Sequence, residues 1–168
     1  MTSIPAWLPV SVSLVSTTIA LIAFSYQVHR ARFNQSVDLL FRLENDFFGA
    51  DKVKQRALAA QNYLVNPQDF IEMEDILDFF ETIAMLTRKK ALDLYMVWHT
   101  FDYWMERYYA IAQPYIKARQ ARDPGVWEDL DWLAPKLAKL QSKKNKGKPG
   151  VFTEPALSAF MAEEAAEI

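Results

Sequence analysis

The sequence predicts an all-α protein made of one N-terminal transmembrane helix followed by a bundle of about five helices. Three observations support this prediction. Apolar residues recur every three or four positions along most of the 168 residues, and no stretch shows the alternation typical of a half-buried strand. The first 28 residues carry no charged side chain, so that all 19 basic and 21 acidic residues follow them. The length suits one folded domain rather than two.

The uncharged opening is interpreted as a membrane anchor that occupies residues 1–28. Residues 7–26 would span about 30 Å as a helix, which is the thickness of the hydrocarbon core of a bilayer. Trp7 and Tyr26 lie at its two ends, where amphipathic rings favour the headgroup level. A cleaved signal peptide is the alternative, but no basic residue precedes the apolar run and no small-residue cleavage site follows it.

Basic residues directly after the uncharged segment predict its orientation. His29, Arg30 and Arg32 follow at once, and positive residues tend to stay on the cytoplasmic side. We therefore expect a single-pass protein of the inner (cytoplasmic) membrane, with its N-terminus outside and its C-terminal domain in the cytoplasm. Membrane lipid would be its first partner, through the N-terminal helix.

Small residues share one side of the expected membrane helix: Ser13, Ser16, Thr17 and Ala20. Small residues allow helices to approach closely in lipid, so this side is a candidate transmembrane interface. The alternative is that the hydroxyl groups bond back to their own helix and have no further role.

The helical bundle domain is assigned to residues 29–142. Its first helical pattern runs from Phe33 to Phe48 and ends at Gly49. Because neither proline nor glycine separates it from the membrane segment, the two are expected to form one rod. A second helix follows with Asp51 as its cap and ends at Asn66.

Three more helices complete the expected bundle. One starts at Pro67, and a long aromatic-rich helix opens near Asp93. Pro114 removes a backbone donor from that helix, which predicts a kink. The fifth helix is expected to start at Asp123-Pro124 and to bend or restart at Pro135.

Residues 143–168 change in character and are interpreted as a basic linker followed by an acidic tail. Lys143, Lys144, Lys146 and Lys148 alternate with glycine, proline and polar residues, which is typical of a flexible connection. Residues 153–168 hold four glutamates and no basic residue. An isolated helix of this length is marginal in water, so a flexible tail is expected, with a docking peptide as the alternative.

Four features together resemble a large set of bacterial single-span, all-helical, membrane-anchored proteins known only as a domain of unknown function. They are the N-terminal anchor, Phe79-Phe80-Glu81, Trp98-x-x-Phe101-x-Tyr103-Trp104-x-x-Arg107-Tyr108, and Pro114-Tyr115-Ile116 with Arg119 after it. The resemblance covers roughly residues 5–140. The chain departs from the family's pattern at Lys89-Lys90-Ala91, in the turn before the long helix, where family members often have a glycine. The resemblance implies an architecture and no activity.

Composition argues against most kinds of catalysis. The chain has no cysteine and two histidines, which excludes disulfides, thiolate metal sites and a cysteine nucleophile. No serine lies in a nucleophile elbow, and no glycine-rich loop is present to hold a phosphate. We therefore expect no enzyme and no cofactor. A formal charge of −2 gives no general reason to bind nucleic acid.

Residues His99, Asp102 and Glu106 form a polar row on one side of the fourth helix. Di-metal bundles need a Glu-x-x-His motif on two helices, and the chain has none. The row is therefore interpreted as a solvated face, and no metal is predicted.

Arg107 lies away from the polar side of its helix, among apolar neighbours. A partly buried arginine needs a carboxylate and further acceptors, and Glu81 is the candidate partner in a structural ion pair. The functional alternative is an anion or ligand site at this arginine.

Eight aromatic residues between Tyr95 and Tyr115 are interpreted mainly as core filler. A ligand pocket or an interface is the alternative, and its candidate residues are Trp98, Tyr103, Trp104 and Tyr109.

These patterns favour a membrane-anchored helical interaction module, either an accessory subunit or a self-associating scaffold, with a protein partner or a second copy of the chain. The alternative is a membrane-tethered sensor that binds a small anionic or aromatic ligand near Arg107. A closed, dry core would favour the scaffold, and an open cavity with Arg107 on its wall would favour the sensor.

Overall fold

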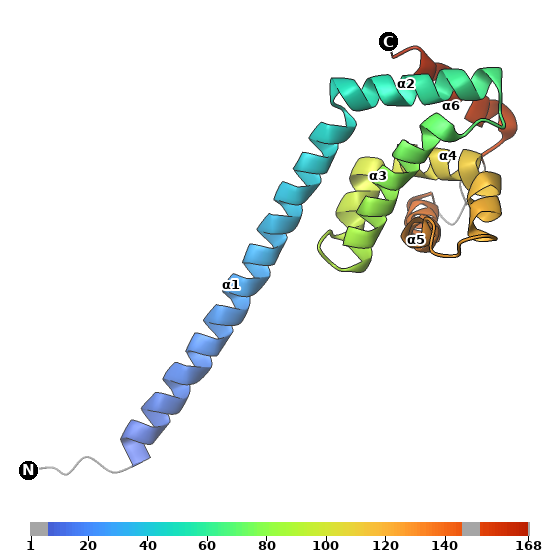
Figure 1. The fold of residues 1–168 in the computed structure, drawn as a ribbon. Coiled ribbons are helices and arrows are strands. Elements are labelled where there is room, and N and C mark those ends of the chain that lie inside the picture. The colour runs from blue at the N-terminus through green and yellow to red at the C-terminus, as the bar shows by residue number, and fades with distance from the viewer. Residues whose placement is uncertain (1–6, 146–151, 168) are drawn as a thin grey trace, which may run out of the picture. The chain divides into compact units, whose positions relative to one another are not determined.

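The computed structural model is all-helical, as predicted. It describes the backbone of residues 7–145 and 152–167, and side chains from Ser16 onward. Six helices make up this part of the chain (Figure 1): α1 Trp7–Phe47, α2 Ala50–Val65, α3 Ile71–Arg88, α4 Leu94–Gln120, α5 Glu128–Lys144 and α6 Glu154–Ala165. The chain divides into two compact units, residues 1–38 and residues 39–168.

The prediction of an N-terminal transmembrane helix is wrong, and the inner-membrane localisation falls with it. In the part of the chain that the structure describes, no helix has both the length and the apolar character needed to cross a bilayer. The prediction relied on the absence of charge, and hydroxyl residues such as Thr17 and Thr18 satisfy that criterion without being apolar.

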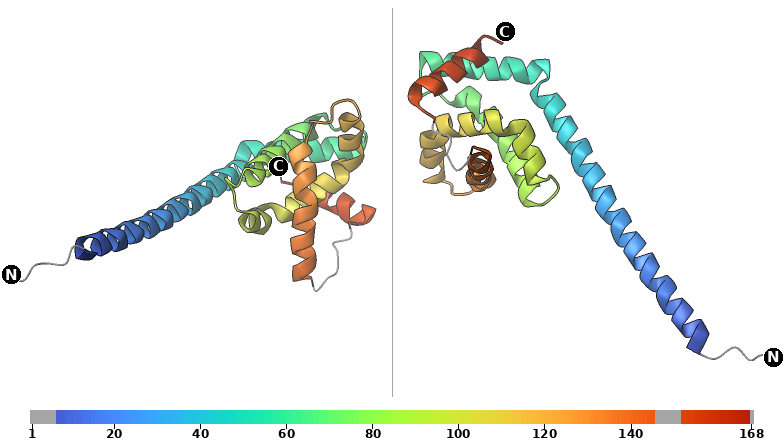
Figure 2. Two further views of the ribbon diagram at one scale, coloured as in Figure 1. Left: turned by 90° about the horizontal axis from the view of Figure 1, so that it is seen from below. Right: turned by 180° about the vertical axis from the view of Figure 1, so that it is seen from behind.

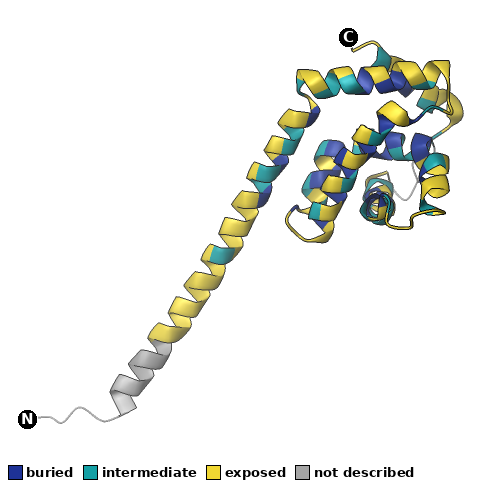
Figure 3. Ribbon diagram, in the orientation of Figure 1, coloured by how far each residue is buried: buried dark blue, intermediate teal, exposed yellow. Residues whose placement is uncertain are grey.

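The candidate transmembrane interface presupposed a membrane-spanning helix, and the described part of α1 does not meet that condition. Ser16, Thr17 and Ala20 are exposed, whereas Ser13 lies outside the residues whose side chains the structure describes, as does the rest of 7–15. Residues 16–35 are exposed apart from the half-buried Val28 (Figure 3).

A glycine makes the junction between α1 and α2. The expected end of the first helix at Gly49 is confirmed, since α1 ends at Phe47 and Gly49 caps α2. A Cβ atom on Gly49 would lie 3.1 Å from the carbonyl oxygens of Asn45 and Asp46, which leaves little room for a side chain. Asp51 is not the cap; it lies in the first turn of α2, where a negative charge favours the helix dipole.

The core of residues 39–168 is built around aromatic rings at the end of α1 and on α3 and α4. Phe47, Phe80, Phe101 and Tyr108 are fully buried, and the Phe47 ring centroid lies 5.6 Å from that of Phe80 and 5.7 Å from that of Phe101. α3 packs against α2, α4 and α5 (Figure 2). Burying such large rings supplies much of the stability of a thin bundle.

α4 begins as predicted. Asp93 accepts hydrogen bonds from the backbone N–H groups of Tyr95 (2.9 Å) and Met96 (3.1 Å), which makes it the N-cap. The helix continues through Pro114, and its axis turns in its second half (Figure 1). Because proline has no N–H to donate to the fourth residue before it, a bend there is expected.

α5 starts later than predicted. The residues after Asp123-Pro124 form a turn, and Trp127 adopts a left-handed conformation with φ of 51° just before the helix begins at Glu128. Pro135 lies inside α5 without ending it. The backbone N–H groups in the first turn of α5 are capped instead by a side chain from α3, which is described below.

The C-terminal segment expected to be a flexible tail contains a packed helix. α6 lies beside α2 and α4, and Phe160, Met161 and Glu164 are buried. The marginal stability of an isolated helix of this length does not apply once an apolar face is buried against other helices. Most of the lysine-rich linker, residues 146–151, lies outside the described residues.

Candidate functional site

A cavity of about 320 Å³ opens between α4, the end of α5 and Phe152, which lies two residues before α6. Its lining residues carry both signs of charge together with aromatic rings: Trp98, His99, Asp102, Tyr103, Glu106, Arg107, Gln141, Lys144 and Phe152.

The periodicity of α4 builds most of the cavity wall. Trp98, Asp102 and Glu106 are four residues apart and therefore share one side of the helix. Gln141 and Lys144 come from the last turns of α5, which packs on α4. The sequence row of His99, Asp102 and Glu106, interpreted as a solvated face, thus lines a cavity instead.

Two carboxyl groups meet in the cavity wall. Glu106 is only 8% exposed, and Asp102 lies one helical turn before it in the same cavity wall. Burial and the neighbouring Asp102 carboxylate raise the pKa of Glu106 to about 7. Burial also raises the pKa of Asp102. When both groups are ionised, Asp102 Oδ1 and Glu106 Oε1 receive no donor from the described residues.

Trp98 brings a buried donor to the same cavity. The residue is 6% exposed, and its indole Nε1 has no hydrogen-bond acceptor among the residues that the structure describes. Lys144 Nζ lies 5.0 Å from the centroid of the Trp98 ring, a cation–π distance. A buried N–H group without an acceptor costs free energy, so this position favours a ligand that offers one.

Arg107 lines the cavity without a carboxylate partner. Its Nη1 donates to the Tyr103 carbonyl oxygen at 2.6 Å, and its guanidinium carbon lies 3.7 Å from the Tyr103 ring centroid and 5.4 Å from that of Phe152. Neither Arg107 nor Lys144 forms an ion pair with any carboxylate in the described ranges. Two cations and two carboxyl groups therefore share one cavity without direct pairing.

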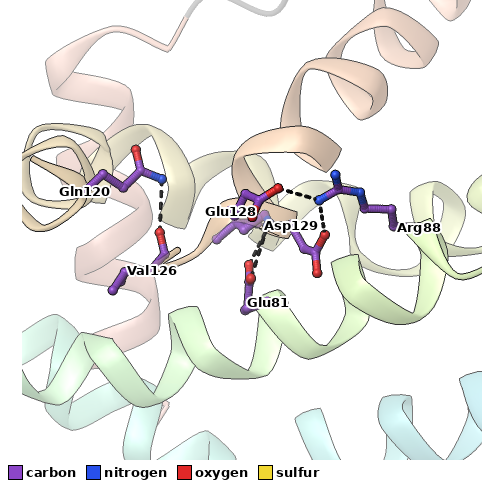
Figure 4. Close-up of polar contacts among 7 residues, drawn as sticks. Glu81, Arg88, Gln120, Val126, Glu128 and Asp129 are labelled. Carbon is purple, nitrogen blue, oxygen red and sulfur yellow. Dashed lines mark hydrogen bonds and ion pairs between the residues drawn. The ribbon is translucent and has the colours of Figure 1, made fainter. Parts of the chain in front are cut away.

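The predicted ion pair between Arg107 and Glu81 is wrong, because Glu81 has another role. Its Oε1 accepts from the backbone N–H of Asp129 at 3.1 Å, and its Oε2 accepts from that of Leu130 at 2.7 Å (Figure 4). These donors belong to the first turn of α5, where backbone N–H groups have no partner within the helix. Glu81 on α3 thus caps α5, which explains why α5 begins at Glu128.

Other contacts in Figure 4 fix the same turn. Arg88 on α3 donates to Glu128 at 2.9 Å and to Asp129 at 2.6 Å, and Gln120 donates to the Val126 carbonyl oxygen at 3.0 Å. α3 therefore holds the start of α5 through two side chains, Glu81 and Arg88, and α4 contributes Gln120.

Two of the candidate ligand aromatics lie elsewhere. Trp104 Nε1 donates to Glu164 on α6 at 3.2 Å. Tyr109 lines a second cavity, of about 380 Å³, and its hydroxyl donates to Asp131, which also pairs with Lys117 at 2.8 Å. Because these polar groups already have partners, this second cavity is a weaker ligand site.

Sequence reasoning missed a buried polar cluster at Glu164. Arg56 Nε lies 3.0 Å from Glu164 Oε2, and both side chains are nearly inaccessible. Tyr108 donates to the same oxygen at 2.7 Å, and Arg56 also donates to the Phe47 carbonyl oxygen at 3.1 Å. A signal was present, since Arg56 interrupts the apolar side of α2.

The structure brings no metal site together. The described residues contain no group of three or more histidine, cysteine, aspartate or glutamate side chains placed to hold a metal ion. Chemically, the cavity offers two oxygen acceptors, an indole donor and two cationic groups against aromatic rings. This set is suited to binding a small polar molecule.

The fold and the cavity define an all-α bundle with a polar, aromatic-walled cavity. The chain belongs to the family described as Domain of unknown function (DUF4760), whose pattern matches residues 10–137. Comparisons with curated proteins and with solved structures found no match. The predicted resemblance to a domain of unknown function is confirmed, and the bacterial origin it implied stays a prediction. Function must therefore be argued from the geometry.

Proposed function

We propose that the protein is a helical module that binds a small ligand in the cavity between α4 and α5. The observation that carries this proposal is that Trp98, Glu106, Arg107 and Lys144 line one cavity, where the buried Trp98 Nε1 and Glu106 Oε1 have no hydrogen-bond partner among the described residues. Buried polar groups in folded proteins normally have partners, so a cluster that lacks them favours a ligand. The proposal takes up the ligand-binding alternative from the sequence, with its site near Arg107.

Catalysis is not part of the proposal. The sequence offers no nucleophile with an adjacent base, and the carboxyl pair of Asp102 and Glu106 serves equally well to bind a cationic group. The expectation that the protein is not an enzyme stays a prediction.

The test uses the Trp98 indole N–H as a reporter. The chain has five tryptophans, whose indole signals are resolved in a ¹H–¹⁵N spectrum, and a Trp98→Phe variant assigns the signal. A library of small polar fragments is added to the full-length protein. We expect ligands to shift the Trp98 signal and to leave that of Trp127, whose Nε1 donates to Asp78 at 2.8 Å, unchanged. If no fragment shifts the Trp98 signal at millimolar concentration, the proposed function is wrong.

A second candidate function, self-association, is favoured by the surface of α1. Ile19, Tyr26 and Phe33 follow one another at intervals of seven and are 62%, 66% and 56% exposed. An exposed apolar row at this interval is typical of the seam between two helices of a coiled coil. A second copy of the chain is the partner that such a row fits, as in the scaffold hypothesis.

Sedimentation velocity over a range of concentrations tests this candidate. We expect the full-length protein to dimerise and Tyr26→Glu to abolish the dimer, because the charge would fall within the apolar seam. Gln27→Glu places the same charge beside the row and is the matched control. A protein that is monomeric at all concentrations would exclude self-association through α1.

A further inference from the structure

We propose that the cavity binds a small zwitterion, with its amino group on the Asp102–Glu106 pair, its acidic group on Arg107, Lys144 and the Trp98 indole, and a ring or apolar side chain against the aromatic wall. This inference rests on the proposed function and adds the chemical class of the ligand.

The carboxyl groups of Asp102 and Glu106 are suited to bind the amino group of the ligand. Asp102 Oδ1 and Glu106 Oε1 are buried and lack donors from the described residues. An ammonium group supplies up to three N–H donors together with a positive charge that compensates the two carboxyl groups. An anionic ligand, or a neutral one without N–H or O–H groups, would leave both buried oxygens without donors.

Three donors select the acidic group. The Trp98 indole N–H has no acceptor among the described residues, and Lys144 Nζ lies over the Trp98 ring at 5.0 Å from its centroid. Arg107 uses one N–H on the Tyr103 carbonyl oxygen and keeps others for a ligand. A carboxylate or phosphate on the ligand would accept from all three, and charge-assisted bonds of this kind are the stronger ones.

The two ligand charges must lie close together. The positive charges of Arg107 and Lys144 act directly on the Asp102 carboxyl group, so the cationic and anionic walls adjoin within one cavity of about 320 Å³. This size is at the small end of ligand pockets. Tyr103 and Phe152 complete the wall with aromatic rings, which favours a zwitterion of amino-acid size with an apolar or aromatic side chain.

The experiment compares L-phenylalanine, which carries both charges, with two analogues that carry one. Phenethylamine lacks the carboxylate, and 3-phenylpropionate lacks the amino group. Binding to the full-length protein at pH 7.5 is followed by the Trp98 indole signal and by calorimetry. We expect phenylalanine to bind at least about tenfold more tightly than either single-charge analogue. A tenfold loss of affinity on removal of one charged group corresponds to about 1.4 kcal/mol.

Two variants test which side of the cavity binds the amino group of the ligand and which binds its acidic group. Glu106→Gln should abolish the preference for phenylalanine over phenylpropionate, because the amino group loses its charged acceptor. Lys144→Ala should weaken the preference over phenethylamine. Lys144 is exposed, so this variant is expected to fold even if Glu106→Gln does not. Lys139→Ala, another exposed lysine on α5, is the matched control and should leave all three affinities unchanged.

The outcomes separate the two proposals. If a single-charge analogue binds as tightly as phenylalanine, or if other fragments shift the Trp98 signal and phenylalanine does not, the zwitterion is wrong while the proposed function holds. If no molecule shifts that signal, both are wrong.

Discussion

Arg56 and Arg107 both lie among apolar residues of their helices, yet their environments differ. Arg56 is 3% exposed and pairs with Glu164, whereas Arg107 is half-buried and lies on a tyrosine ring at the mouth of a cavity. An arginine on an apolar face needs a group that compensates its charge. For Arg56 that group is the Glu164 carboxylate, and for Arg107 the aromatic rings of Tyr103 and Phe152 take its place.

The pKa of Glu106 predicts how stability depends on pH. Its ordinary value is 4.5, and burial beside Asp102 raises it to about 7 in the folded protein. Between these values the folded state holds a proton that the unfolded state releases. This contribution to stability is therefore complete below pH 4.5 and is lost as the pH rises through 7.

We expect the free energy of unfolding, relative to that of Glu106→Gln, to decrease from pH 5 to pH 8. Urea denaturation across this range measures it. His99, Asp102, Arg107 and Lys144 face the same cavity, and the two chains compared differ only at Glu106. Parallel pH profiles for the two chains would show that Glu106 titrates normally.

Glu164 predicts a large effect of a single charge. Removal of its carboxylate by Glu164→Ala leaves the buried Arg56 without a carboxylate partner, and breaking such a pair typically costs about 3–5 kcal/mol. Urea denaturation should show a loss of this order. Arg56→Met combined with Glu164→Leu should recover much of it, because no buried charge then remains. Glu163→Ala, an exposed neighbour on α6, should change stability little. A loss below about 0.5 kcal/mol for Glu164→Ala would contradict the buried pair.

The starts of α4 and α5 show which elements a sequence can predict. Asp93 caps α4 through its own side chain, and a local pattern of this kind is visible in the sequence. α5 is capped by Glu81, which is 48 residues away from Asp129, so no local pattern could place its start at Glu128. Prediction of the cavity from the sequence is limited in the same way. Its α4 residues form a row that the sequence shows, whereas Lys144 and Phe152 come close to this row only when the helices pack.

The cap on α5 can be tested with a double-mutant cycle. Glu81→Ala should lower the free energy of unfolding by about 1–2 kcal/mol, the usual cost of losing an N-cap acceptor. Combined with Arg107→Ala, the two effects should add, because the residues do not contact each other. A coupling energy above about 1 kcal/mol would restore the ion pair that the sequence predicted.

Across the whole molecule, the last helix completes the core rather than trailing from it. Phe160 is 2% exposed, and its ring centroid lies 5.2 Å from that of Tyr108 and 5.8 Å from that of Tyr103. The sequence showed an acidic, short segment after a lysine-rich linker, and composition alone could not reveal that α2 and α4 offer it a surface. The anchor failed as a prediction for a related reason, since lack of charge was taken for apolar character.

Substitution of Phe160 distinguishes a docked helix from a tail. Phe160→Ala should destabilise the protein by about 3 kcal/mol, the cost typical of emptying a buried phenylalanine site. Ser158→Ala, on the exposed side of α6, should be close to neutral. Thermal or urea denaturation of the two variants checks the difference, and equal stabilities would mean that α6 does not contribute to the folded core.

Three residues belong both to the cavity and to the contacts of α6. Tyr103 donates to Glu163 at 3.3 Å and packs on Phe160, Arg107 lies near the rings of Phe152 and Phe160, and Phe152 itself leads into α6. A molecule that orders these side chains in the cavity also favours the docked position of α6. Thermodynamic reciprocity then requires that the docked helix strengthen binding by the same factor. Under the proposed function, the docking of α6 and the binding of a ligand in the cavity are therefore thermodynamically linked.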